Sequence, residues 1–352
     1  MDWGVARRVA TAIARDGGDT DSRFGPTAVA EACTEAAASV RAYTGLAAGI
    51  DLPAGEAVRR PEWAASALDS MRELAAPIDR RAAESIDLPG ALGTLARRLA
   101  GAASGAEAGG AVGLAGRRVL GQLDVSLGPS ERPPRLLFVG PNVAAAHREL
   151  GGDADAFLAW IATHEVTHAA QFAGVQWLRE HLANELGALL EAAAGGIDPR
   201  RLAAALRSAI TSDPRRSIQR LLRGEAILAL AGPEQRARFD RLQAAMTLVE
   251  GYAEHVMDAA DPDRREERAE LRAGLARRRE SRGGLGEAVA RMLGLELKLR
   301  QYRLGKAFCD RIVAEHGVEA LNRAWSGPAA LPSLPELERP DRWLARAVGA
   351  PA

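Results

Sequence analysis

Patterns typical of β-strands occur in only one region of this 352-residue chain. Short apolar or alternating runs at residues 123–127 and 136–139 are separated by a loop that contains Gly-Pro-Ser and Pro-Pro. Elsewhere, apolar residues mostly recur with the period of an amphipathic helix. We therefore predict an α+β protein that is predominantly helical and has one small β-sheet. Helices are expected at residues 1–14, after Pro26, after Pro61, and at 154–173, 176–194, 199–211, 214–230, 233–259 and 286–316.

Three segments have less regular patterns. Residues 87–118 are rich in glycine and alanine, and they fit either small-residue helices in close contact or a partly mobile connection. The segment from Arg264 to Arg282 is crowded with arginine and glutamate, which is typical of a solvated helical face or a mobile loop. The tail after Trp325 contains prolines at intervals, which favours an extended wrap that ends in a short helix near Trp343.

Composition and charge disfavour several classes of protein. The chain has 46 basic and 46 acidic residues, so its net charge is zero and a general binder of nucleic acids or anionic membranes is not expected. It contains no run of about 18 uncharged apolar residues that would span a membrane, and its first residues lack the pattern of a signal peptide. Cys33 and Cys309 are too few for a disulfide framework, and we expect thiols without a catalytic role. A cytoplasmic protein is therefore expected.

The segment from His164 to His168 has the sequence His-Glu-Val-Thr-His, the pattern His-Glu-x-x-His on a predicted helix. Both histidines fall on the apolar stripe of this helix, between Ile161 and Phe172. Residues four apart lie one turn up the same face, so both imidazoles can bind one metal ion. Glu165 lies at the flank of that face, where a carboxylate can reach a water molecule on the metal. The alternative is two core histidines and one surface glutamate.

Catalytic zinc usually has three protein ligands and one position for water, so a third ligand is expected elsewhere in the chain. Glu250 falls on the apolar stripe of the predicted helix at 233–259, where a carboxylate is costly unless it is paired or bound to a cation. A buried ion pair with an arginine is the alternative. Glu254, one turn further on, can accept the free N–H group of a zinc-bound histidine. His255 is a rival third ligand, but it projects away from Glu250 around the helix.

These residues resemble the zincin metallopeptidases whose third ligand is a glutamate. In that group the ligand lies in an Asn-Glu-Gly-Phe-Ala-Glu segment, and this chain has Glu-Gly-Tyr-Ala-Glu from Glu250 to Glu254. The resemblance implies that His164, His168 and Glu250 bind zinc, that Glu165 is the general base, and that Glu254 lies in the outer shell of the site. The chain between His168 and Glu250 is much longer than in the familiar aminopeptidases, so this resemblance covers the motifs only.

A second resemblance extends from residue 1 to the tail. The segment His-Glu-Val-Thr-His-Ala-x-Gln-Phe, the later Glu-Gly-x-Ala, the pattern from Gln301 to Phe308 and the pattern from Asn322 to Trp325 resemble a family of actinobacterial and related bacterial proteins. Its members are described as zincin-like metallopeptidases or as coenzyme F-420 biosynthesis-associated proteins. The resemblance implies a zincin-like core in which the small sheet lies beside the metal helix. It also associates the chain with the deazaflavin coenzyme pathway, without implying a reaction.

The chemistry that the resemblance implies uses zinc-activated water, with Glu165 as the residue that takes its proton. A donor for the developing oxyanion is also needed, and the candidates are Tyr302, Tyr252 and His255. In zincins an edge strand before the metal helix commonly holds the substrate backbone. The run from Leu136 to Val139 is expected to be that strand.

We interpret the chain as a zinc-dependent metallopeptidase that acts on a peptide or another amide, with Zn2+ as its cofactor. The alternative is a zincin-like metal-binding protein with a regulatory or accessory role in coenzyme F-420 biosynthesis and little turnover. A metal-free helical scaffold with a buried polar network is the third interpretation. We expect a single unit over residues 1–352, with an N-terminal helical part at 1–120, the metal-site core at 121–325 and a C-terminal wrap at 326–352.

Overall fold

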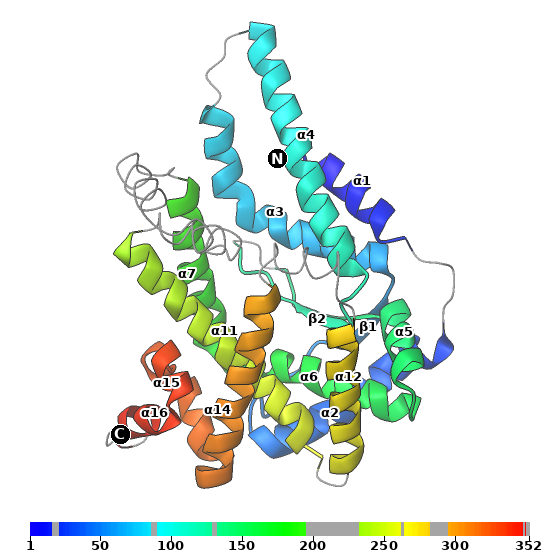
Figure 1. Ribbon diagram of the computed structural model, residues 1–352, viewed down its shortest axis with the longest axis vertical. Coiled ribbons are helices and arrows are strands. Elements are labelled where there is room, and N and C mark those ends of the chain that lie inside the picture. The colour runs from blue at the N-terminus through cyan, green and yellow to red at the C-terminus, as the bar shows by residue number, and fades with distance from the viewer. Residues whose placement is uncertain are drawn as a thin grey trace. The chain divides into compact units, whose positions relative to one another are not determined.

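The computed structural model describes residues 1–15, 21–85, 90–128, 132–194, 232–261, 264–281, 295–347 and 349 (Figure 1). The chain divides into two compact units. Unit 1 comprises Met1–Glu180 and Ala253–Arg278, and unit 2 comprises His181–Tyr252 and Arg279–Ala352. The long helix α11, Pro233–Ala259, begins in unit 2, and its last turns belong to unit 1. The division predicted from the sequence, with boundaries after residues 120 and 325, stays a prediction.

Helices make up most of the described chain, as the sequence predicts. Helix α5, Gly140–Leu150, is an addition that the sequence pattern does not predict. The predicted helices at 199–211 and 214–230, and the first part of the one at 286–316, lie outside the described residues. None of the described helices is long and apolar enough to cross a membrane. The predicted helices that the structure confirms are α1 (Trp3–Ile13), α2 (Pro26–Thr44), α3 (Arg60–Ser85), α6 (Ala154–Gly174), α7 (Gln176–Ala194), α11 and α14 (Leu295–Asn322).

Within the described residues, one sheet of three strands has the order β1-β3-β2. These strands are β1 (Gly55–Val58), β2 (Gly121–Asp124) and β3 (Arg135–Val139). β1 is parallel to β3, and β2 is antiparallel to it. Both predicted strands are confirmed, although β2 begins and ends earlier than predicted. β1 escapes prediction because its four residues, Gly-Glu-Ala-Val, show neither the apolar alternation nor the apolar run that is typical of a strand.

β3 lies in the middle of the sheet, with a hydrogen-bonded strand on each side. The expectation that Leu136 to Val139 forms an edge strand for a substrate backbone is therefore wrong. The reason is that β1 comes from a distant part of the chain and pairs with four of the five residues of β3, with Gly55 opposite Leu136 and Val58 opposite Val139. Among the described residues, β1 and β2 form the two edges of the sheet.

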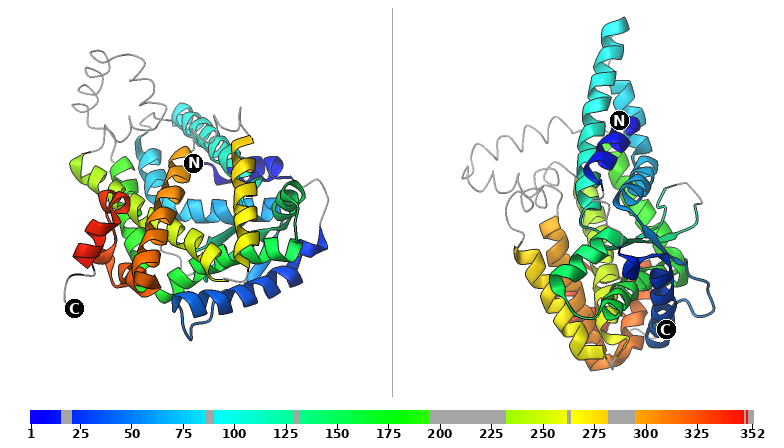
Figure 2. Two further views of the ribbon diagram at one scale, coloured as in Figure 1. Left: turned by 60° about the horizontal axis from the view of Figure 1, so that its bottom comes forward. Right: turned by 90° about the vertical axis from the view of Figure 1, so that its right-hand side faces the viewer.

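Different helices cover the two faces of the sheet. Because successive side chains of a strand point to opposite faces, Leu137 and Val139 of β3 point to one face, where they share a core with Trp63 of α3 and with residues of α1. On the other face, Gly55 of β1 lies against Cys33 of α2. Helices α2 and α6 lie side by side on this second face (Figures 1 and 2). The predicted position of the sheet beside helix α6 is confirmed.

Helix α4, Gly90–Gly116, shows which interpretation of the glycine-rich segment is right. Gly105 and Gly109 face α1, where a side chain on either glycine would overlap backbone atoms of Asp2 or Ala6. The small residues therefore allow two helix backbones to approach closely. The interpretation as a small-residue helix in close contact is confirmed for the described part of this segment.

The charged segment forms helix α12, Arg265–Ser281, and two of its arginines contact α11. Arg268 is buried and donates a hydrogen bond to a backbone carbonyl group of α11. Arg272 forms ion pairs with Glu254 and Asp258 of the same helix. The expectation of a solvated helical face is confirmed for Glu266, Glu270 and Ala273 of α12, which are exposed, whereas Arg268 and Arg272 face α11. The guanidinium groups of both arginines thus find partners on α11.

The tail after Trp325 consists of short helices instead of extended chain. They are a 3-10 helix at Pro328–Ala330, then α15 at Leu334–Glu338 and α16 at Pro340–Ala347. Proline suits the first turn of a helix, where its missing N–H group needs no partner. The predicted short helix near Trp343 is confirmed, and the fully buried indole of Trp343 donates to the carbonyl oxygen of Ala330 at 2.8 Å.

Glu336 links α15 to α16. Its carboxylate accepts hydrogen bonds from Nε of Arg346 at 2.7 Å and from the backbone N–H group of Ser333 at 2.8 Å. Burial alone would raise the pKa of this carboxyl group, but the hydrogen bonds from Arg346 and Ser333 outweigh it and lower the pKa of Glu336 to about 2.

Glu336→Gln is expected to remove a stabilisation that depends on pH. The folded pKa of about 2 lies below the ordinary value of 4.5, so the stabilisation is complete above pH 4.5 and is lost as the pH falls toward 2. We expect the variant to be less stable by about 1–2 kcal/mol at neutral pH, because the exposure of Arg346 weakens the ion pair. Urea unfolding of both proteins between neutral pH and about pH 2.5 measures the difference. Glu338→Gln, at an exposed neighbour, is the control, and a difference that does not vary with pH would contradict the prediction.

Candidate metal centre

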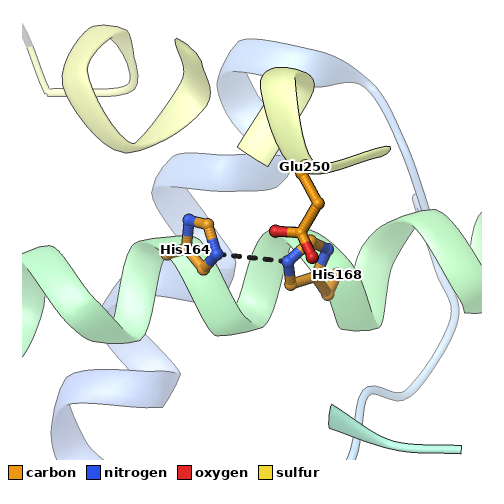
Figure 3. Close-up of side chains that lie close together, drawn as sticks. All are labelled: His164, His168 and Glu250. Carbon is orange, nitrogen blue, oxygen red and sulfur yellow. Dashed lines mark hydrogen bonds between the residues drawn. The ribbon is translucent and has the colours of Figure 1, made fainter. Parts of the chain in front are cut away.

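Helix α6 carries its two histidines one turn apart. Asp153 caps the start of the helix by accepting the N–H group of Ala156 at 2.8 Å, and most residues from there to Gln171 are buried. The helix is therefore held firmly, and His164 and His168 project from the same side. Their Nε2 atoms are 3.2 Å apart (Figure 3).

Gln171 sets the tautomer of His168. Its Oε1 atom, which can only accept, lies 2.9 Å from Nδ1 of His168. Nδ1 therefore carries the proton, and the lone pair of Nε2 is available to a metal ion. Gln171 is fully buried, so this arrangement is fixed. This role of Gln171 is not predicted from the sequence, although its position three residues after His168 places the two side chains on neighbouring turns.

Glu250 projects from α11 toward the two histidines (Figure 3). Each of the three residues offers a ligand atom, and these atoms all lie within 4.8 Å of one another. Around a tetrahedral zinc ion with bonds of about 2.0–2.1 Å, ligand atoms are about 3.3 Å apart. The two imidazole nitrogens have this spacing, and the carboxylate reaches it with at most a small side-chain movement. Two histidines and one carboxylate are also a common donor set of catalytic zinc, so these residues fit the ion.

Glu165 follows His164 on α6 and lies against the sheet. Its side chain is buried beside Gly121, the first residue of β2. Burial, together with the negative charge of Glu165, raises the pKa of the Cys33 thiol to about 12. Cys33 therefore stays protonated and unreactive at neutral pH, in agreement with the expectation of a thiol without a catalytic role.

The family of the chain follows from a comparison along its length. Residues 1–344 match the model of a family described as zincin-like metallopeptidase. The chain belongs to this family. It is also similar to the crystal structure of a protein from Chloroflexus aurantiacus described as a candidate hydrolase with a novel fold, with 28% sequence identity over 100% of both chains and a TM-score of 0.69. No curated protein matches the chain. The predicted zincin-like fold class is thereby confirmed.

In this zincin-like protein, the glycine that follows Glu250 has a clear structural role. Gly251 packs against Gly305 of α14, and a Cβ atom at position 251 would overlap the backbone of Gly305. A Cβ atom at position 305 would in turn overlap the carbonyl oxygen of Thr247. Backbone atoms cannot move aside as a flexible side chain can, so the crossing of α11 and α14 requires glycine at both positions. The contact holds α11 at the residue next to Glu250.

Glu254, one turn after Glu250, lies against Arg272. The two side chains form an ion pair, and Nη2 of Arg272 also donates to the backbone oxygen of Glu254 at 3.0 Å. The same guanidinium group binds Asp258 and lies 5.8 Å from the ring centre of Trp160. The predicted role of Glu254, as the acceptor for a zinc-bound histidine, stays a prediction.

The three candidate oxyanion donors lie in different surroundings. Tyr252 is fully buried, and its hydroxyl group donates to Oδ1 of Asn322 at 2.7 Å, a bond that it would have to break in order to act. His255 shares a hydrogen bond of 2.7 Å between its Nε2 atom and the hydroxyl group of Tyr43. Tyr302 belongs to α14, but its side chain lies outside the described residues. The role of all three as oxyanion donors stays a prediction.

Proposed function

We propose that this chain is a zinc-dependent hydrolase that cleaves peptide bonds. The observation that supports this most is the convergence of His164, His168 and Glu250, with Glu165 next to the first histidine on the same helix. A glutamate in this position is the usual general base of such a site. Membership of a metallopeptidase family supports a peptide as the substrate.

Each residue has a distinct role in the proposal. His164 and His168, through Nε2, and Glu250, through its carboxylate, would hold the zinc ion. When bound, zinc lowers the pKa of a water molecule toward about 7 and polarises a carbonyl group. Glu165 accepts the proton of the attacking water and later donates it to the leaving amine nitrogen. Gln171 keeps His168 in the tautomer that ligation requires.

Glu250→Ala is expected to weaken zinc binding by at least about 100-fold, because only two of the three protein ligands remain. The wild type is expected to hold about one zinc ion per chain after zinc is supplied and the excess removed. Metal content measured by mass spectrometry on both proteins tests this. Asp240→Ala changes an exposed carboxylate on the same helix and should bind zinc as the wild type does. Equal zinc content in all three proteins would contradict the assignment of Glu250 as a ligand.

Hydrolysis needs a separate test, because metal binding does not establish turnover. The zinc-loaded wild type is incubated with a mixture of peptides from a digested bacterial proteome, and new termini are identified by mass spectrometry. We expect cleavage that a chelator abolishes and added zinc restores. Binding of zinc without any cleavage would contradict the peptidase proposal and favour the accessory role in coenzyme F-420 biosynthesis that the sequence resemblance suggests.

A further inference from the structure

Edge strand β2 presents different residues to its two sides. On the side of α3, Gln122 accepts a hydrogen bond from the indole N–H group of Trp63 at 2.7 Å. Asp124, two residues further along, points the same way and accepts from the hydroxyl group of Ser70 at 2.7 Å. Because side chains alternate along a strand, residue 121 points to the opposite side, toward α6.

Gly121 lies directly against the carboxylate of Glu165. A Cβ atom built at position 121 would lie 2.6 Å from Cγ of Glu165 and 2.8 Å from both Cδ and Oε1. These are the three nearest atoms, and all belong to the same side chain. Carbon atoms in contact are normally separated by about 3.5–4.0 Å. A side chain at position 121 and the observed position of the Glu165 carboxylate are therefore incompatible.

The obstacle at this position is a flexible side chain and not the backbone. This distinguishes Gly121 from Gly251 and Gly305, whose missing Cβ atoms would meet backbone atoms. The φ angle of Gly121 is also not in the positive range that favours glycine. Alanine at position 121 is thus acceptable to the strand and to the fold, and the group that has to move is the carboxylate of Glu165.

We propose that Gly121 is a positioning residue for Glu165: the absence of a side chain lets the edge strand pass against the carboxylate and fixes where that carboxylate lies. This inference rests on the proposed function, in which Glu165 is the general base. A displacement of about 1 Å of a reacting group can lower a rate by about 100-fold, so even one methyl group at position 121 is expected to matter.

Gly121→Ala tests the proposal, with Gly110→Ala as the matched control. Gly110 lies in α4, and a Cβ atom there meets nothing within 4 Å. Crystal structures of the zinc-loaded wild type and both variants measure the position of the Glu165 carboxylate directly. We expect a displacement of about 1 Å in Gly121→Ala alone, with unchanged His164, His168 and Glu250 and an unchanged zinc content. A carboxylate that stays in place would overturn the proposal.

Hydrolysis of fluorescein-labelled casein supplies the second readout. We expect kcat to fall at least about tenfold in Gly121→Ala with KM within about twofold of the wild type, because the substrate still binds while the base is misplaced. Activity equal to that of Gly110→Ala would overturn the proposal. If the wild type does not cleave casein, the peptidase proposal fails for this substrate, and the crystallographic displacement still decides whether Gly121 positions the carboxylate.

Discussion

The variant Glu165→Gln is expected to keep its zinc and its fold, but its rate of hydrolysis is expected to fall by a factor of about 10²–10⁴. Glutamine has nearly the same size and shape as glutamate, but its amide group cannot accept the proton of the attacking water. Glu165 is only 7% exposed, and because glutamine fills nearly the same volume we expect the packing around the side chain to be kept. Zinc content, melting temperature and cleavage rate of the same peptides are measured on both proteins.

Glu180→Gln, at an exposed glutamate in α7, is the control for the loss of a carboxylate elsewhere in unit 1. If Glu165→Gln cleaved every substrate of the wild type equally well, the general-base assignment would be wrong. Loss of zinc together with loss of hydrolysis would instead indicate that Glu165 takes part in metal binding.

Gly305→Ala is expected to have the largest effect on stability. The added methyl group would overlap the carbonyl oxygen of Thr247, so α11 and α14 have to move apart along their contact. Overpacking of this kind costs about 1–3 kcal/mol and can cost more when the obstacle is backbone, so we expect a loss of about 3 kcal/mol and a melting temperature lower by about 6–12 °C. Thermal unfolding followed by circular dichroism measures the shift.

Gly187→Ala is the matched control for this experiment. Gly187 lies in α7 of unit 2, and a Cβ atom there meets nothing within 4 Å. Alanine is the better helix former, so this variant is expected to gain about 0.5–1 kcal/mol. Two glycine-to-alanine changes in helices of the same unit should therefore shift stability in opposite directions. Equal shifts would mean that the contact between α11 and α14 is looser than the structure indicates.

The parts of the candidate site that the sequence predicts are those that depend on one helix at a time. His164 and His168 are one turn apart on any helix, and Glu250 is conspicuous as a carboxylate on an apolar stripe. The contributions of Gln171 and Gly121 are harder to predict for different reasons. Gln171 acts only through its contact with His168, and the importance of Gly121 depends on a strand that lies far from α6 in the sequence.

The same distinction applies to the fold. Helices and the two strands at 121–139 follow from local periodicity, whereas β1 becomes a strand through its pairing with β3. The arginines of α12 also show that local sequence does not predict contacts between helices. Their sequence pattern is that of a solvated surface, and only the carboxylates of Glu254 and Asp258 on α11 explain why Arg272 is held in place.

The parallel pairing of β1 with β3 has a consequence for how unit 1 folds. Helices α3 and α4 and strand β2 all lie between the two paired strands in the sequence, so this contact closes a long loop. Closing such a loop costs chain entropy before the contacts that stabilise it have formed. Parallel strand pairs therefore form slowly. Helix α6, by contrast, is built from local hydrogen bonds. We therefore expect the two histidines to come together early in folding, with the sheet that supports Glu165 completed late.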